Sequence, residues 1–297
     1  MSLIIAIDQG TTSTRTVAFD RDLNIIHSQQ KEYSLKYPND GWVEIEPDEL
    51  MASVQNTLDP VLEACSDIVA LGITNQRETT LVWDASTGKS IYNAIVWQDR
   101  RTAGDCARLK KDGYEETIKN KTGLLLDPYF SATKISWILD NVDGARQKAA
   151  NGELRFGTVD TYLLWQLSDG AIHKTDVTNA SRTNLFNIHS KVWDQELLDI
   201  FNIPSSMLPD VHLSDSVFGE ISRQNRKIKI SGLIGDQQSA LVGQKCFEPG
   251  QMKATFGTGC FLMVNTGDKS NPSSSGLLNT IGYGISNQTP YALEGSI

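Results

Sequence analysis

An acidic side chain stands where a buried strand meets a helix in the second half of the sequence. Asp236 follows the apolar run 228–234 and Gly235, and it precedes Gln237 at the start of a helical pattern. A carboxylate held between two rigid elements, near the crevice where strands end, is a candidate general base for a substrate hydroxyl. The alternative is that Asp236 only caps its helix. The neighbouring motifs favour the catalytic role.

A hydroxyl-rich turn near the N-terminus has the composition of a phosphate-binding loop. It runs from Asp8 to Arg15 and contains Gly10, Thr11, Thr12 and Ser13. Its glycine allows close backbone approach, its hydroxyls and Arg15 donate to phosphate oxygens, and Asp8 can hold a Mg²⁺ ion carried by a nucleotide. A tight hairpin with solvated hydroxyls is the alternative. A later turn, Gly257-Thr258-Gly259, repeats the pattern between two strands and favours the phosphate interpretation.

Further positions are suited to contact with a polyol. Arg77 and Glu78 follow a buried strand, and a guanidinium beside a carboxylate both donates to and accepts from hydroxyl groups. Trp97 follows the apolar run 94–96 and could form an aromatic wall, whereas Tyr129 precedes a helix that Ser131 is expected to cap. The alternatives are a surface ion pair for the charged residues and core packing for Trp97.

A sheet with its covering helix must position these residues. Two strands are predicted on either side of the first turn, and a third strand follows the turn at residues 20–22. Further strands are predicted beside the later polar motifs. The predicted strands are Leu3–Ile7, Thr14–Phe19, Ile25–Tyr33, Ile68–Ile73, Thr80–Trp83 and Ile228–Ile234. A helix begins near Pro47, and Pro60 is expected to kink it or to end it early. From Thr102 to about Leu208 the pattern is mostly helical. This order predicts an α/β domain with a mixed sheet.

The repeated strand, Gly-Thr turn and strand unit predicts a duplicated fold. The expected division is a first domain over residues 1–246, with the candidate polyol contacts, and the start of a second domain over 247–297. Three short strands without a covering helix cannot bury both faces of a sheet. The second domain is therefore expected to be incomplete within these 297 residues.

Composition excludes several classes of protein. The formal net charge of −9 disfavours a nucleic-acid partner, and no apolar run is long enough to predict a membrane span. A strand beginning at Leu3 leaves no room for a secretory signal, and the four cysteines are widely dispersed, which is typical of reduced thiols in a cytoplasmic protein. The four histidines lack metal-ligand spacing.

The motifs together resemble the FGGY family of carbohydrate kinases along essentially the whole chain, which would be the N-terminal portion of a member. The string Asn75–Thr80 is similar to that of members that phosphorylate glycerol rather than pentuloses, and Tyr129–Asn141 fits the first signature of the family. The other matching segments are Ile7–Ser13, Ile95–Arg101, Gly157–Thr161, Gly235–Gln238 and Phe256–Phe261.

The resemblance implies an actin-like, ribonuclease-H-like ATPase fold with duplicated domains, of which the first binds the polyol and the second, begun at residues 247–297, binds ATP. It implies ATP-dependent, Mg²⁺-dependent phosphorylation of glycerol to sn-glycerol 3-phosphate, and a homo-oligomeric full-length protein. It makes Asp236 the base. It assigns glycerol contacts to Arg77, Glu78, Trp97, Tyr129, Asp236, Gln237 and Phe261, phosphate contacts to Thr11, Thr12, Ser13, Arg15, Gly257 and Thr258, and the metal to Asp8 and Asp236.

Two other functions stay open at this stage. One is a kinase that acts on another polyol or on a ketose. The other is a non-catalytic role, in which these residues form a polyol-binding domain or a structural piece of a larger protein. Substrate identity depends mainly on Arg77 and Glu78.

Overall fold

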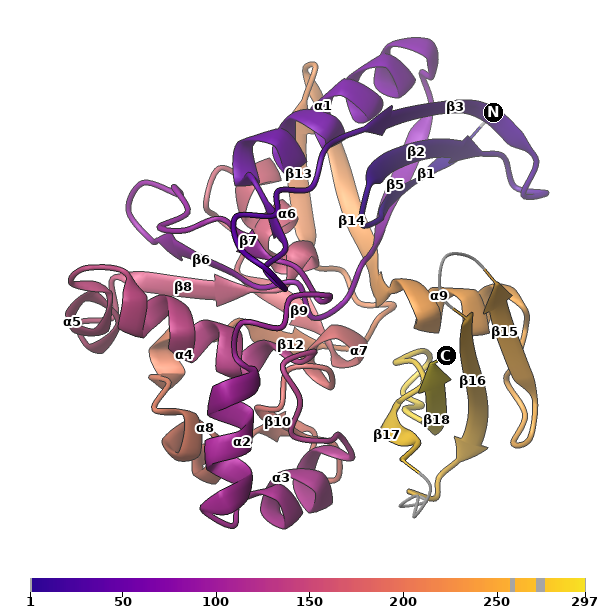
Figure 1. Ribbon diagram of the computed structural model, residues 1–297. Helices are drawn as coiled ribbons and strands as arrows, with labels where there is room; N and C mark the ends of the chain where they lie inside the picture. Colours follow the sequence, from indigo (N-terminus) through magenta and orange to yellow (C-terminus); the bar gives the residue numbers. More distant parts are fainter. Residues whose placement is uncertain (1, 257–259, 271–275, 297) are drawn as a thin grey trace.

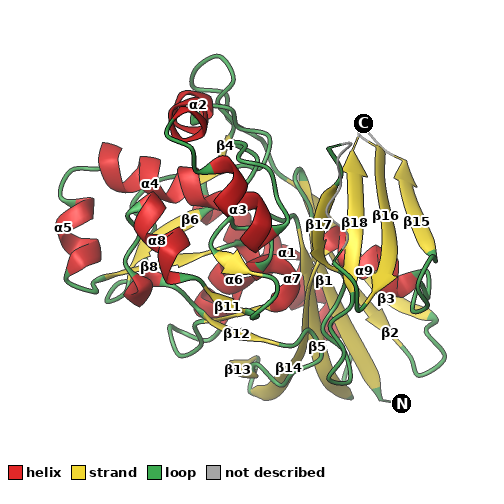
Figure 2. Ribbon diagram, turned by 90° about the horizontal axis from the view of Figure 1, so that it is seen from below, coloured by secondary structure: helices red, strands yellow, loops and turns green. Residues whose placement is uncertain are grey.

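The computed structural model describes residues 2–256, 260–270 and 276–296. A six-stranded mixed sheet with helices on one face forms one part, and a four-stranded antiparallel sheet forms another (Figures 1 and 2). Helix α9 (Asp236–Gly243) leads from the end of the first sheet towards the second (Figure 1). The α/β class predicted from the sequence is confirmed.

The six-stranded sheet has the order β13-β14-β5-β1-β2-β3. The hairpin strands pair antiparallel, whereas β5 runs parallel to both β1 and β14. Three antiparallel strands beside parallel ones is the ribonuclease-H-like arrangement that the resemblance implies. The bounds are β1 Leu3–Gln9, β2 Ser13–Phe19, β3 Ile25–Glu32, β5 Ile68–Asn75, β13 Gly219–Arg223 and β14 Arg226–Gly235.

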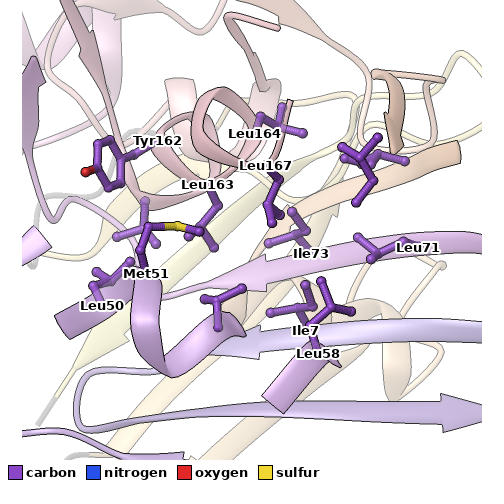
Figure 3. Close-up of a cluster of buried hydrophobic side chains, with 14 of the residues drawn as sticks. Ile7, Leu50, Met51, Leu58, Leu71, Ile73, Tyr162, Leu163, Leu164 and Leu167 are labelled. Carbon is purple, nitrogen blue, oxygen red and sulfur yellow. The ribbon is translucent and has the colours of Figure 1, made fainter. Parts of the chain in front are cut away.

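One face of this sheet forms the main hydrophobic core. Along β1, Leu3, Ile5 and Ile7 are buried and alternate with residues on the opposite face, as the two-residue period of a strand requires. Helices α1 (Pro47–Ala64) and α6 (Val159–Leu167) pack over the buried face and contribute leucines to the core (Figure 3).

Helix α1 passes through Pro60 and ends only at Ala64, so the expected early end is wrong. Proline removes one backbone hydrogen bond and costs about 3 kcal/mol in a helix interior. The next two residues, Val61 and Leu62, are both fully buried in the core. Burial of each such side chain contributes about 1.5–3 kcal/mol, which offsets the cost of the proline.

The region between β7 (Ala94–Ile95) and β13 is mostly helical, as predicted, with short strand pairs between the helices. Its helices are α2 Ala103–Lys111, α3 Glu115–Thr122, α4 Ser131–Asn141, α5 Ala145–Ala150, α6, α7 Val177–Ala180, α8 Gln195–Phe201 and a 3₁₀ turn at Ser205–Met207. The short strands here and in the preceding region are β4 Glu44–Ile45, β6 Leu81–Asp84, β8 Leu154–Gly157, β9 Lys174–Asp176, β10 Phe186–Asn187, β11 Val192–Trp193 and β12 Asp210–His212.

The second sheet has the order β15-β16-β18-β17 and packs closely against the helical region. Asn279 donates its backbone N–H to the carbonyl of Gly123 at 2.9 Å. Gly123 has φ +71° at the end of α3, and a Cβ there would lie 2.2 Å from the Asn279 carbonyl oxygen. Only glycine fits this contact. The bounds are β15 Met252–Phe256, β16 Cys260–Gly267, β17 Leu278–Ile281 and β18 Tyr291–Ser296.

The division into domains at residues 246 and 247 stays a prediction. All four cysteines lie in the described part of the chain and are unpaired, as expected. None of the helices in the described ranges is both long and apolar enough to cross a lipid bilayer.

Leu58 tests the packing of α1 on the sheet. It is fully buried in the core, so Leu58→Ala should lower the free energy of unfolding by about 2–5 kcal/mol through lost burial and a residual cavity. Urea denaturation measures this change. Glu63→Ala, on the exposed side of the same helix, is the control and should change stability by less than about 0.5 kcal/mol. Equal effects of the two variants would contradict the packing.

Candidate active site

A cavity of about 520 Å³ lies where the strands of the first sheet end, and its far wall comes from the second sheet. It brings together nine residues singled out from the sequence: Thr11, Thr12, Arg77, Glu78, Trp97, Tyr129, Asp236, Gln237 and Phe261. Leu35, Tyr37, Gln98 and Thr255 complete its lining. Residues distributed over most of the chain therefore meet at one place.

The turn between β1 and β2 contributes only part of its hydroxyls to this cavity. Thr11 and Thr12 line it, and the Trp97 Nε1–H donates to Thr11 Oγ1 at 2.9 Å. Asp8, Ser13 and Arg15 are not part of the lining. Asp8 and Arg15 are exposed cross-strand partners of β1 and β2, on the sheet face opposite the main core.

A buried amide network beneath the turn fixes its position, and sequence reasoning missed it. Gln9 Nε2 donates to the Tyr33 hydroxyl at 2.6 Å, and the Tyr33 hydroxyl donates to the Gly10 carbonyl. Gln76 Nε2 donates to Gln9 Oε1 at 3.2 Å and to the Gly10 carbonyl at 3.0 Å. These bonds tie the turn to the segment that follows β5.

The guanidinium of Arg77 is almost fully buried, and both of its Nη atoms have hydrogen-bond partners. Nη1 and Nη2 each donate to one carboxylate oxygen of Glu294 at 2.7 Å, and Nη1 also donates to Gln238 Oε1 at 3.0 Å. Burial alone would lower the pKa of Arg77, but the charges of Glu294 and Glu78 raise it well above its ordinary value. A Cβ at Gly235 would lie 2.8 Å from the Arg77 side chain, so the glycine makes room for it.

Glu78 is buried beside Arg77 and is bound by a second arginine. Arg182 Nε donates to Glu78 Oε1 at 2.6 Å, and Arg77 Nε lies 3.8 Å from the same oxygen. Burial raises the pKa of Glu78, although both arginines oppose this shift. Arg182 was not singled out from the sequence, because nothing in its local pattern distinguishes it from a surface arginine.

The backbone of Glu78 is strained. Its φ is +60°, in the left-handed region, and the Thr79 N–H donates across it to the Arg77 carbonyl at 2.7 Å, a pattern found in rare γ-turns. Helix α4 holds this turn: Ser131 Oγ and Lys134 Nζ donate to the Glu78 carbonyl at 3.1 and 3.4 Å. The expected capping by Ser131 is therefore wrong, since its hydroxyl bonds to Glu78 instead.

Asp236 opens α9 with its carboxylate directed at the cavity, where 36% of its side chain is exposed. Its Oδ1 accepts the Gln237 N–H at 2.7 Å and lies 3.3 Å from Arg77 Nε. Although a third of the side chain remains exposed, the surrounding protein raises the pKa of Asp236, and Arg77 opposes this shift. Lys253 donates to Gln237 Oε1 and thereby orients its amide.

Aromatic rings form the apolar side of the cavity. The ring centroids of Trp97 and Tyr129 lie 5.7 Å apart, and those of Trp97 and Phe261 lie 6.2 Å apart, both pairs in edge-to-face arrangement. Opposite charged side chains, such a wall accommodates a short carbon chain while the hydroxyls bind to the charges.

The assignment of Mg²⁺ to Asp8 and Asp236 stays a prediction. No group of three or more metal-binding side chains is found among the described residues. Asp8 lies next to Thr74 across the parallel pair β1 and β5, at the edge towards the cavity. Its exposed carboxylate fits such an ion. Gly257 and Thr258 lie outside the described residues.

The pH dependence of stability tests the buried position of Lys134, whose Nζ donates to the Glu78 carbonyl. Burial lowers its pKa from 10.5 to about 7. Between these values the unfolded chain binds more protons than the folded one, so stability should rise with pH by roughly 1 kcal/mol per unit. In Lys134→Met the slope should be smaller than that of the wild type by about this amount, whereas the contribution of Lys253, whose pKa burial lowers to about 8, should remain. Urea denaturation between pH 7 and pH 10 measures both slopes. The wild-type slope should persist in Ser131→Ala, which removes only a neutral hydrogen bond. If Lys134→Met kept the wild-type slope, the lowered pKa of Lys134 would be contradicted.

The first 243 residues match a known family. The N-terminal domain of the FGGY family of carbohydrate kinases matches residues 3–243. The glycerol kinases of Alteromonas mediterranea and Pseudomonas entomophila are 58% and 55% identical over 99% of this chain. This chain covers 61% and 59% of their lengths, and thus spans about three-fifths of these relatives.

Solved structures agree with this match. The Plasmodium falciparum glycerol kinase with ADP superposes with a TM-score of 0.96 at 41% identity, over 100% of this chain and 61% of that one. A gluconate kinase from Lactobacillus acidophilus has a TM-score of 0.87 at 22% identity, over 99% of this chain and 59% of that one. At that identity the likeness concerns the fold alone.

Proposed function

This chain belongs to the FGGY family of carbohydrate kinases, and we propose that the protein containing it transfers the γ-phosphoryl group of ATP to glycerol, yielding sn-glycerol 3-phosphate. The observation that carries the proposal is the cavity in which Arg77, Glu78 and Asp236 meet opposite an aromatic wall. Relatives named glycerol kinase at 54–58% identity support glycerol as the substrate.

Glycerol fits the balance of groups in this cavity. Arg77 donates to one hydroxyl, and Glu78 accepts from another. Gln237 and Tyr129 offer further polar atoms at the wall, whereas the rings of Trp97 and Phe261 pack against the carbon chain. A ligand with three hydroxyls and a three-carbon chain satisfies both sides of such a site.

Asp236 is the proposed base. Its carboxylate accepts the proton of the attacking hydroxyl while the oxygen forms a bond to the γ-phosphorus and the bond from that phosphorus to the leaving ADP breaks. Because the transition state is loose, the proton moves late, and the raised pKa of Asp236 favours its acceptance. The nearby Arg77 Nε holds the carboxylate in place.

Phosphate oxygens are proposed to lie against the turn between β1 and β2. Thr11, Thr12, Ser13 and Arg15 would donate to them, together with Gly257 and Thr258. A Mg²⁺ ion held by Asp8 and Asp236 would neutralise charge on the phosphates. The tie from Trp97 to Thr11 keeps this turn next to the polyol side of the cavity.

The remaining parts of the proposal concern the whole protein. We place it in the cytoplasm, where ATP is available and unpaired cysteines such as Cys65 stay reduced. We expect it to form a homo-oligomer, which sedimentation of the full-length protein will test.

Replacing the base tests the mechanism. Asp236→Asn keeps the shape of the side chain but cannot accept the proton, so kcat with glycerol should fall by about 10²–10⁴-fold. The measurement is a coupled assay of ADP release by the full-length protein, with circular dichroism to confirm the fold. Turnover at the wild-type rate would remove Asp236 as the base.

Two assays distinguish the alternatives. Comparison of kcat/KM for glycerol and for D-xylulose decides whether the substrate is a polyol or a ketose; a higher value for the ketose would overturn the proposal. Calorimetry on the 297-residue chain tests the non-catalytic alternative. Because two-fifths of the relatives' length is missing from it, we expect it to bind ATP more weakly than the full-length protein.

A further inference from the structure

Two buried residues outside the lining of this cavity hold Arg77 and Glu78, which line it. One of the two, Glu294, lines an adjoining cavity of about 610 Å³ that shares Trp97, Gln98, Tyr129 and Phe261 with the first. Glu294 on β18 is 1% exposed, and its carboxylate accepts both Nη atoms of Arg77 at 2.7 Å. Arg182, which is fully buried beyond α7, donates from Nη2 to Glu294 Oε1 at 3.2 Å. Its Nε donates to Glu78 Oε1 at 2.6 Å.

These four side chains form a closed ring of alternating charge. Arg77 contacts Glu294, Glu294 contacts Arg182, Arg182 contacts Glu78, and the Glu78 carboxylate lies 3.8 Å from Arg77 Nε. All four are at most 2% exposed. Charges that are so deeply buried are tolerated only when each is paired, so the ring acts as a unit. Both arginines have pKa values raised above the ordinary value, and that of Glu294 is held at about 2, where the arginines outweigh burial.

The ring determines which atoms remain for a substrate. On Arg77, both Nη atoms are engaged by Glu294, which leaves Nε facing Asp236 at 3.3 Å. On Glu78, the contacts with the two arginines all involve Oε1, which leaves Oε2. The wall thus offers Glu78 Oε2 as an acceptor beside Arg77 Nε, whose hydrogen a substrate hydroxyl would share with Asp236.

We propose that Glu294 and Arg182 are positioning residues for polyol recognition, which they support by orienting Arg77 and Glu78 rather than by touching the substrate. The inference rests on the function proposed above and extends it to two residues outside the lining of that cavity. It also assigns the second sheet a part in substrate binding, because Glu294 is the contribution of β18.

Loss of the Glu294 charge would redirect Arg77. Without that carboxylate, the Nη atoms would face Arg182 with no counter-ion between the two guanidinium groups. The nearest remaining carboxylates are Glu78 and Asp236, so Arg77 would turn towards the substrate acceptor and the base. The result is a weaker site for polyol and an unchanged one for nucleotide.

The experiment uses the full-length protein with Glu294→Gln, Glu294→Asp and Arg182→Lys. Glu294→Gln should raise the KM for glycerol by about tenfold or more, since one partner of a buried charge pair is lost, while the KM for ATP stays within about twofold of wild type. Glu294→Asp keeps the charge, so its KM for glycerol should lie between those of the wild type and Glu294→Gln. Arg182→Lys keeps the positive charge but cannot donate to Glu78 and Glu294 with the geometry of a guanidinium group. The KM of this variant for glycerol should therefore also rise.

Asp59→Asn is the matched control. Asp59 accepts two hydrogen bonds, at 2.9 and 3.0 Å, from Nε and Nη2 of Arg223, so it too forms a two-point pair with an arginine, but this pair is partly exposed and joins α1 to β13 rather than the cavity wall. It should leave both KM values unchanged. Thermal unfolding of each variant shows whether the fold is retained. If Glu294→Gln does not fold, the KM of Glu294→Asp for glycerol tests the positioning role instead.

The outcomes separate the two claims. A wild-type protein without glycerol-dependent ADP release refutes the proposed function. If the wild type is active and the Glu294 and Arg182 variants keep their KM for glycerol within about twofold, only the positioning role is refuted. A parallel rise of both KM values would also refute it, because that result indicates general loosening of the fold.

Discussion

The structure depends on the register in which β5 pairs with its two parallel neighbours. Gln9 lies opposite Asn75 in the pair of β1 with β5, and Gly235 lies opposite the same Asn75 in the pair of β14 with β5. Three strands therefore end in one row. The residues that follow each strand emerge at the same edge of the sheet, and each begins a functional segment. A shift of register by one residue would turn every side chain of a strand to the other face.

The hydrophobic core maintains this register. Ile7 and Ile73 are buried on the same face of β1 and β5, two positions before the strands end. Because that face is covered by α1 and α6 (Figure 3), slippage would bring polar residues into the core. The positions of the site residues are thus set by core packing.

A second constraint is the pairing of buried charge. Three carboxylates, on Glu78, Asp236 and Glu294, lie among the guanidinium groups of Arg77 and Arg182. Each group is tolerated in the interior only because its partners neutralise it. This mutual dependence couples the second sheet to the end of the first, and it leaves the cavity lined by oriented polar atoms rather than by mobile ones.

Much of the architecture could be predicted from local sequence. The apolar run at residues 3–7 and the hydroxyl-rich turn after it predicted the strands on either side of that turn, and Asp236 was singled out because a strand meets a helix there. Local rules failed at Pro60, where two buried neighbours outweigh the cost of proline, and at Ser131, whose hydroxyl bonds to a distant carbonyl rather than to its own helix. In both cases tertiary contacts compete with a local preference and prevail.

The sequence by itself determined the kinds of residue at the site: a turn with hydroxyls, an arginine beside a glutamate, and an acid at a helix start. Only the tertiary structure decided how they are held. Arg77 and Glu294 are 217 positions apart, and Arg182 and Glu294 are 112 apart. No sequence periodicity links such positions, because contacts between residues so far apart depend on how the strands and helices pack in the folded protein. For that reason the contacts of Glu294 and Arg182 with Arg77 and Glu78 could be recognised only in the tertiary structure, where the two sheets meet.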